Sequence, residues 1–204
     1  MSTPEAYGSA PDDELPPYIG IEPGALRLVQ SSEDAAQALA ALLQADTIGF
    51  DTESKPTFAK GEVSTGPHLV QLATDELVFL FQTATPSGIA LALTVIKPVL
   101  EAERILKVGF GLGDDVRRLR SKFGLELRGV LDLSTALRRR GERNPLGAKS
   151  AVARFLGQRL QKSKRITTTN WALPRLSDRQ LQYAADDAQA ALRIYRQWRA
   201  NPPA

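Results

Sequence analysis

The sequence predicts an α/β fold in which a mixed β-sheet is flanked by helices. Two observations lead to this class. The first strand candidates include a hairpin, with Thr74-Asp75-Glu76 between two apolar runs. Further along, strand candidates alternate with helical segments, which is the pattern of an α/β layer structure. The chain has 204 residues, 43% of them hydrophobic and 24% charged, which suffices for one domain with a sizeable core.

The elements follow from local signals taken in order. Residues 1–22 are rich in Pro, Gly, Ser and acidic side chains, so we expect a mobile acidic tail, and the domain itself over residues 23–204. Apolar runs bounded by turn residues predict strands over 26–29, 47–51, 68–73, 77–81, 104–109 and 129–131. Apolar spacing and N-capping residues predict helices over 34–44, 89–101, 115–123, 133–140, 147–156 and 177–198.

Composition excludes several classes of protein. The chain contains no cysteine, which rules out disulfides, thiolate metal sites and cysteine nucleophiles. No apolar run approaches the length of a membrane span, and the N-terminus lacks a signal pattern, so we expect a cytoplasmic protein with no membrane partner.

The charge is distributed unevenly along the chain. Residues 1–103 contain 4 Lys/Arg and 15 Asp/Glu, whereas residues 104–204 contain 22 and 8. A basic half of this kind favours a polyanionic partner such as nucleic acid, although a solvated basic surface without a partner has the same composition.

A pair of carboxylates, Asp51 and Glu53, directly follows the apolar run Ile48-Gly49-Phe50. In a strand, residues two apart point to the same face, so both acids are expected side by side at the end of a buried strand. Like charges there repel and lose hydration, and a divalent cation such as Mg²⁺ or Mn²⁺ makes the pair tolerable. A solvated turn with two acids present by chance is the alternative.

A glycine-rich turn over 109–113 leads from a predicted strand into a helix that begins with Asp114 and Asp115. One interpretation is a dinucleotide fingerprint with Asp132 as the ribose acid, but Asp114 stands where the third fingerprint glycine belongs and would repel a pyrophosphate. The other interpretations are helix N-capping, favoured for Asp114, and an acid that projects toward a metal.

The last predicted helix carries Tyr183 and Asp187 four residues apart, hence on one face. That face continues through apolar residues, and a carboxylate in an apolar stripe is expected to be paired or metal-bound. Asp186 lies about 100° round the helix and is expected to be solvated or capping. A core tyrosine with a bonded hydroxyl is the alternative for Tyr183.

These three stretches together resemble the DEDD 3′–5′ exonucleases. Asp51-x-Glu53, an Asp in a strand-turn-helix, and Tyr183-x-x-x-Asp187 match the three motifs in order, and the tyrosine marks the tyrosine variant of the family. The likeness covers roughly residues 25–198 and is strongest to the group of ribonuclease D and the Werner-syndrome exonuclease domain. Asp115 fits the second motif better than Asp114 because Val116 and Leu119 supply its apolar positions.

The resemblance implies a ribonuclease H-like fold and hydrolysis of phosphodiester bonds from the 3′ end of DNA or RNA, with release of nucleoside monophosphates. It implies two divalent cations held by Asp51, Glu53, Asp115 and Asp187, with Asp51 bridging both and Tyr183 orienting the attacking water. A nucleic-acid-binding module of the same fold without activity is the alternative function, although four intact acids argue against it.

The basic half supplies candidates for contact with the nucleic-acid backbone. They are Arg138, Arg139, Arg140, Lys162, Lys164 and Arg165. Trp171 or Phe58 is a candidate for stacking on a terminal base, with packing in the core or a loop as the alternative for each.

Overall fold

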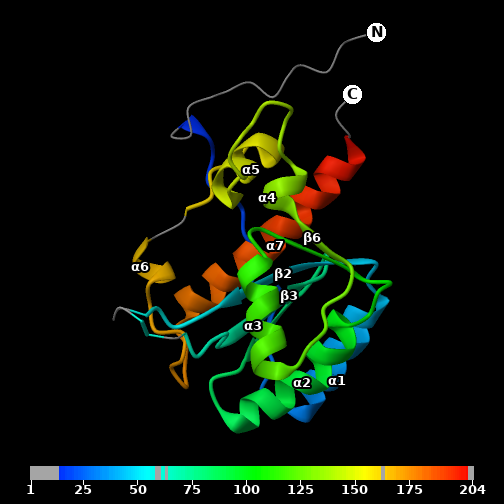
Figure 1. Ribbon diagram of the computed structural model, residues 1–204, viewed down its shortest axis with the longest axis vertical. Coiled ribbons are helices and arrows are strands. Elements are labelled where there is room, and N and C mark those ends of the chain that lie inside the picture. Colours follow the sequence, from blue (N-terminus) through cyan, green and yellow to red (C-terminus); the bar gives the residue numbers. More distant parts are fainter. Residues whose placement is uncertain (1–13, 58–60, 63, 162–163, 202–204) are drawn as a thin grey trace.

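The computed structural model describes residues 14–57, 61–62, 64–161 and 164–201. Its centre is a β-sheet (Figure 1). The sheet has six strands in the order β1-β4-β3-β2-β5-β6. The strands are β1 (Leu26–Leu28), β2 (Thr47–Glu53), β3 (Leu69–Ala73), β4 (Val78–Gln82), β5 (Leu106–Gly109) and β6 (Val130–Asp132). Pairs β2–β3 and β3–β4 are antiparallel, and the other three are parallel. The predicted mixed sheet is therefore confirmed.

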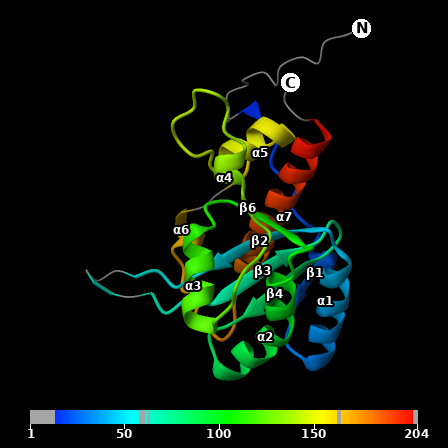
Figure 2. The same cartoon turned by 45° about the vertical axis from the view of Figure 1, so that its right-hand side comes forward.

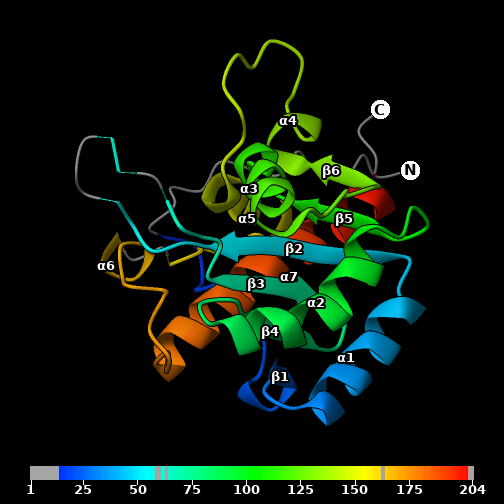
Figure 3. The same ribbon diagram turned by 60° about the horizontal axis from the view of Figure 1, so that its bottom comes forward.

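Helices cover both faces of this sheet (Figure 3). Helices α1 (Ser32–Gln44) and α2 (Pro86–Leu100) pack on one face, and the long α7 (Asp178–Ala200) crosses the other. The remaining helices are the short 3₁₀ turn η2 (Pro23–Ala25), α3 (Gly113–Phe123), α4 (Leu133–Ala136), α5 (Ala148–Leu156) and α6 (Lys164–Thr167). Helix α6 was not expected from the sequence, in which this stretch has no apolar periodicity.

Strict alternation along β2 decides which side chains face α7. Ile48 and Phe50 are fully buried in the core under α1 and α2. Since successive side chains of a strand point to opposite faces, Gly49, Asp51 and Glu53 face α7. The central strand thus separates an apolar core on one face from a polar set on the other.

The predicted helix over 133–140 is too long. Helix α4 ends at Ala136, and the chain turns at Gly141, whose φ of +93° favours glycine. Glu142 stabilises this turn, because it accepts from the Arg139 amide and pairs with Arg154 at 2.6 Å. The loop that follows projects away from the sheet (Figure 2).

Part of the expected mobile tail over 1–22 packs against the domain, and residues 1–13 lie outside the described part. The Pro16 carbonyl accepts from the Arg159 amide at 2.7 Å, and Ile21 is 5% exposed. Apolar side chains after the two prolines explain this packing. Tyr18 and Ile21 bury apolar surface against the domain, which acidic side chains do not provide.

Among the residues that the structure describes, none of the helices combines the length and apolar composition that a bilayer crossing requires.

Candidate active site

Strand β2 and helix α7 meet at unusually short range. A Cβ built on Gly49 would lie 2.0 Å from the carbonyl oxygen of Ala188, so only glycine fits there. Helix α7 begins with a capping box, in which the Ser177 hydroxyl accepts from the Gln180 amide and the Gln180 side chain accepts from the Ser177 amide. The contact brings the end of β2 against the turn of α7 that carries Asp187.

Three of the predicted carboxylates gather at this contact. One oxygen each from Asp51, Glu53 and Asp187 lies within 4.8 Å of the other two. Asp187 is 9% exposed, and the two strand acids are half-buried. Three hard oxygen donors at this spacing fit a divalent cation such as Mg²⁺ or Mn²⁺ and would repel one another without it.

Asp115 is not one of the three members of this group, and it contacts strand β2 at Thr52. The Thr52 hydroxyl donates to the Asp115 carboxylate, and Thr52 stands between Asp51 and Glu53 in the strand. Burial raises the pKa of Asp115, whereas the Thr52 bond and the charge of Arg118 lower it in part. Asp114 instead pairs with Arg117 at 2.6 Å on the exposed side of α3. Neither acid caps the helix, which has no side-chain cap.

Tyr183 shares the α7 face with Asp187 and is 9% exposed. Burial raises the pKa of Tyr183 far above its ordinary value, and the charges of Asp187 and Glu53 and a hydrogen bond to Asp187 raise it further. The phenol therefore keeps its proton at neutral pH. Its chemistry is that of a hydrogen-bond donor, not of a general base.

Gln71 of β3 is the residue opposite Asp51 in the antiparallel ladder. Its side chain is fully buried, and among the residues that the structure describes neither its amide nitrogen nor its amide oxygen has a hydrogen-bond partner. Directly opposed residues point to the same face of a sheet, so this amide lies on the sheet face that carries Asp51 and Glu53. Leaving a buried amide without a partner lowers the free energy of unfolding by about 1–3 kcal/mol. Gln71 therefore destabilises the fold next to the acid cluster.

Two amides of the glycine-rich turn bind a carboxylate of the protein itself. Asp132 accepts hydrogen bonds from the amides of Gly111 and Leu112, at 2.9 and 3.1 Å. Its Oδ1 also accepts from the Ser134 amide at the start of α4. The carboxylate predicted as a ribose acid thus occupies the turn itself, and the dinucleotide interpretation of residues 109–113 is wrong.

The predicted nucleic-acid contacts lie in different places. Trp171 is fully buried and packs against Tyr183 with ring centroids 6.2 Å apart, so it has no exposed face for a base and is a core residue. Arg138, Arg139 and Arg140 are exposed in the loop after α4. Lys164 and Arg165 lie in α6, whereas Lys162 and Phe58 fall outside the described residues.

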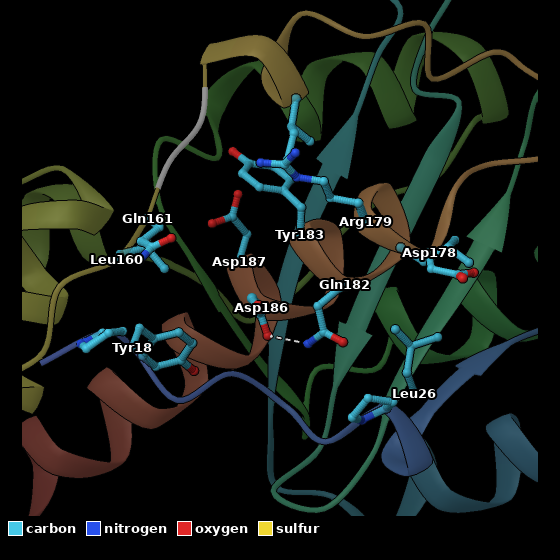
Figure 4. Close-up of a pocket in the computed structure, with 14 residues that line it drawn as sticks. Tyr18, Leu26, Leu160, Gln161, Asp178, Arg179, Gln182, Tyr183, Asp186 and Asp187 are labelled. Carbon is cyan, nitrogen blue, oxygen red and sulfur yellow. Dashed lines mark hydrogen bonds between the residues drawn. The ribbon is translucent and has the colours of Figure 1, made fainter.

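A cavity of about 780 Å³ opens beside Tyr183 and Asp187 (Figure 4). Tyr18, from the segment predicted as tail, lines it together with Leu160 and Ile166. Sequence reasoning missed Tyr18, and the available signal was the apolar run Tyr18-Ile19-Gly20-Ile21 after Pro16-Pro17.

The fold and the acid cluster agree with comparisons to known proteins. The family model described as 3′-5′ exonuclease matches residues 26–200. The Aedes aegypti Nibbler EXO domain is 26% identical with a TM-score of 0.71, over 89% of this chain and 92% of that one. Trypanosoma brucei RNase D in complex with RNA U12 is 26% identical with a TM-score of 0.74, over 87% and 63%.

Curated relatives point the same way. An Arabidopsis thaliana 3′-5′ exonuclease is 29% identical over 162 residues, which are 77% of this chain and 54% of that protein. The mouse bifunctional 3′-5′ exonuclease/ATP-dependent helicase WRN is 29% identical over 80% of this chain and 11% of its own length. The chain thus spans about half or less of these two relatives.

Fold and acid cluster together define a ribonuclease H-like nuclease domain of the DEDD superfamily. Within it, the chain belongs to the 3′-5′ exonuclease family, whose model covers most of its length. The predicted family and fold are confirmed.

Proposed function

We propose that this protein removes nucleotides from the 3′ end of DNA or RNA by metal-dependent hydrolysis of phosphodiester bonds. The proposal is carried by one observation, the meeting of Asp51, Glu53 and Asp187 within 4.8 Å. A cluster of acids alone attracts no polyanion. Once bound cations neutralise its charge, the cluster can bind a phosphate group. Membership of the exonuclease family supports this function.

Four carboxylates would hold two divalent cations, Mg²⁺ or Mn²⁺. Asp51 would contact both, Glu53 and Asp187 would complete one site, and Asp115 would serve the other. When bound, such ions lower the pKa of a water molecule and stabilise the charge that develops on the departing oxygen.

The protein's own groups hold the reactants in place. Thr52 donates to Asp115 and so fixes the orientation of that carboxylate. Tyr183, protonated at neutral pH, would orient the attacking water through its hydroxyl.

We place the exonuclease domain over residues 23–204, with the segment from Pro16 packed against it. Exposed Arg138, Arg139 and Arg140, together with Lys162, Lys164 and Arg165 in and before α6, would contact the phosphate backbone. Ile166, which directly follows Arg165 in the sequence, lines the cavity beside Tyr183 and Asp187. Contacts of this type position a strand and read no sequence.

The test is a shortening assay on a 5′-labelled single-stranded RNA and a 3′-recessed DNA, each with Mg²⁺ or Mn²⁺. We expect a ladder of shortened products that disappears with EDTA and in Asp51→Asn. Retention of either substrate in a gel without any shortening would instead support a binding module of the same fold. The two substrates, assayed in parallel, show whether DNA or RNA is preferred.

A further inference from the structure

The segment Pro16–Ile21, here called the strap, joins two parts of the protein that are distant in sequence. On one side it pairs with the chain after α5, where the Tyr18 amide donates to the Arg159 carbonyl at 2.9 Å. On the other side it lies along the outer face of α7. The strap therefore bridges the end of α5 and the helix that carries Asp187.

Asp186 and Gln182 bind the strap to α7. The Ile21 amide donates to the Asp186 carboxylate at 2.9 Å, and the Gln182 amide donates to the Ile21 carbonyl at 2.8 Å. Gln182 also donates to Asp186 at 2.9 Å, so the two side chains hold each other (Figure 4). This arrangement gives Asp186, which the sequence predicts as solvated or capping, a structural partner beside Asp187.

The fit of the strap depends on a glycine. A Cβ on Gly20 would lie 2.1 Å from Asp186 Oδ1, so a larger residue there must displace the carboxylate that accepts from the Ile21 amide. Further along, Arg193 donates to the Ile19 carbonyl at 2.7 Å. A flexible tail would need neither the glycine nor these bonds.

Tyr18 is the aromatic residue that the strap brings to the cavity. Its hydroxyl donates to Gln189 at 3.3 Å, and the Arg193 guanidinium lies 5.7 Å from its ring centroid. Burial raises the pKa of Tyr18 to about 12, so this hydroxyl stays protonated and bonded. Both contacts hold the ring in one orientation at the wall of the cavity.

The lining of the cavity favours a nucleoside over a phosphate. Its volume of about 780 Å³ lies within the range of small-molecule sites. The apolar part of the lining consists of six side chains from separate parts of the chain: Pro17, Pro23, Leu26, Leu160, Ile166 and Leu181. Arg179 is the one cation among the described lining residues, against the carboxylates of Asp178, Asp186 and Asp187.

We propose that the strap forms a nucleoside-binding wall of the active site, in which Tyr18 contacts the base of a nucleotide next to the scissile phosphate. The inference rests on the proposed exonuclease function, because Tyr183 and Asp187 border the same cavity. Stacking on an aromatic ring is tolerant of base identity, which suits an enzyme that removes nucleotides in succession.

A matched pair of small substrates tests this wall. Thymidine 5′-(p-nitrophenyl phosphate) carries a nucleoside, whereas methyl p-nitrophenyl phosphate has the same leaving group and charge without one. For Tyr18→Ala we expect KM for the thymidine ester to rise about tenfold or more, which corresponds to the free energy of one base-stacking contact. Hydrolysis of the methyl ester should stay within about twofold of the wild type.

Two further variants separate binding from folding. Tyr18→Phe keeps the ring and should raise KM far less than Tyr18→Ala, whereas Tyr18→Leu keeps apolar bulk without the ring and should behave as Tyr18→Ala. Gly20→Val, which displaces the strap, should raise the same KM, and Gly24→Ala, with no atom within 4 Å of the new Cβ, should not. Thermal melting of each variant checks that the fold is retained.

The outcomes are distinguishable. An unchanged KM for the thymidine ester in Tyr18→Ala and Tyr18→Leu overturns the proposal, as does an equal loss on both esters, which indicates a structural role. If the wild type hydrolyses neither ester nor shortens an oligonucleotide, the proposed exonuclease function itself fails.

Discussion

Gly49 and Ala188 lie so close that their contact sets the distance between the central strand and the last helix. The hypothetical Cβ of Gly49 would stand 2.0 Å from the Ala188 carbonyl oxygen, which is backbone and has no rotamer with which to move away. Asp51 follows two residues after Gly49, and Asp187 directly precedes Ala188. The close approach of two backbones is therefore what brings acids from different elements together.

Gly49→Ala should destabilise the protein by about 1–3 kcal/mol or more, because overpacking against backbone forces β2 and α7 apart. Urea unfolding followed by circular dichroism measures this free energy. Gly24→Ala is the matched control, since nothing lies within 4 Å of its new Cβ. Equal stability of the two variants would show that the strand–helix contact is looser than described.

Thr52→Val should weaken Mn²⁺ binding about 10- to 100-fold, the usual effect of removing a hydrogen bond that orients a metal ligand. Valine has the shape of threonine but cannot donate to Asp115. Thr52→Ser keeps the hydroxyl and should keep most of the affinity. Titration calorimetry compares the three proteins, and a Thr52→Val affinity equal to that of the wild type would contradict the proposed use of Asp115.

Asp187→Asn should abolish hydrolysis while the metal-free protein melts at the same temperature or higher. The substitution removes one of three repelling carboxylates from a largely buried position. Scanning calorimetry in EDTA and the oligonucleotide assay measure the two effects separately. A fall of several degrees in the metal-free melting temperature would mean that the carboxylate stabilises the fold.

Tyr183→Phe should lower kcat by about tenfold or more and leave the Mn²⁺ affinity nearly unchanged, because the hydroxyl positions water and does not ligate the metal. The ring keeps its packing against Trp171, so the fold is expected to persist. Steady-state kinetics and calorimetric titration supply the two numbers. Parallel losses of turnover and metal affinity would contradict the assigned role.

Lys107 offers a pH test away from the site. Its side chain is fully buried in β5, donates to the carbonyls of Ala102 and Arg128, and has its pKa lowered from 10.5 to about 8 by burial. Between these pH values the unfolded chain binds more protons than the folded one, so stability attributable to Lys107 rises with pH. Below about pH 8 both states are protonated, and this contribution no longer changes.

The variant Lys107→Met isolates that contribution, because every other titrating group remains. We expect the free energy of unfolding of the wild type, relative to Lys107→Met, to increase from about pH 8 to about pH 10.5. Denaturant unfolding at several pH values measures the difference. A difference that stays constant or decreases over this range would mean that the pKa of Lys107 is not lowered in the folded state.

The sequence predicted those features of the fold that local sequence patterns determine. Period-two alternation separated Phe50 from Asp51, and capping by Ser177 marked the start of the last helix. The choice of Asp115 over Asp114 followed from the family resemblance, in which Val116 and Leu119 fill the apolar positions of the second motif, and in the structure Asp114 pairs with Arg117 whereas Asp115 accepts from Thr52. Such features depend on neighbours in the chain.

Features that depend on distant partners were not predictable. Tyr18 and Ile21 sit in a stretch of tail-like composition, and the partners that hold them, in α7 and at Arg159, are distant in the sequence. Trp171 lies in a polar stretch of sequence, yet the ring of Tyr183 covers it in the core. The end of α4 at Ala136 depends on Glu142 and Arg154, which close a turn that helix propensity alone does not foresee.

The central claim is that distant carboxylates form one cation site, and calorimetric titration of the metal-free protein with Mn²⁺ tests it most directly. We predict saturable binding in the wild type that is largely lost in Asp51→Asn, although the variant remains folded. The account would be contradicted by a wild type that takes up no Mn²⁺, or by an Asp51→Asn variant that binds it with undiminished affinity.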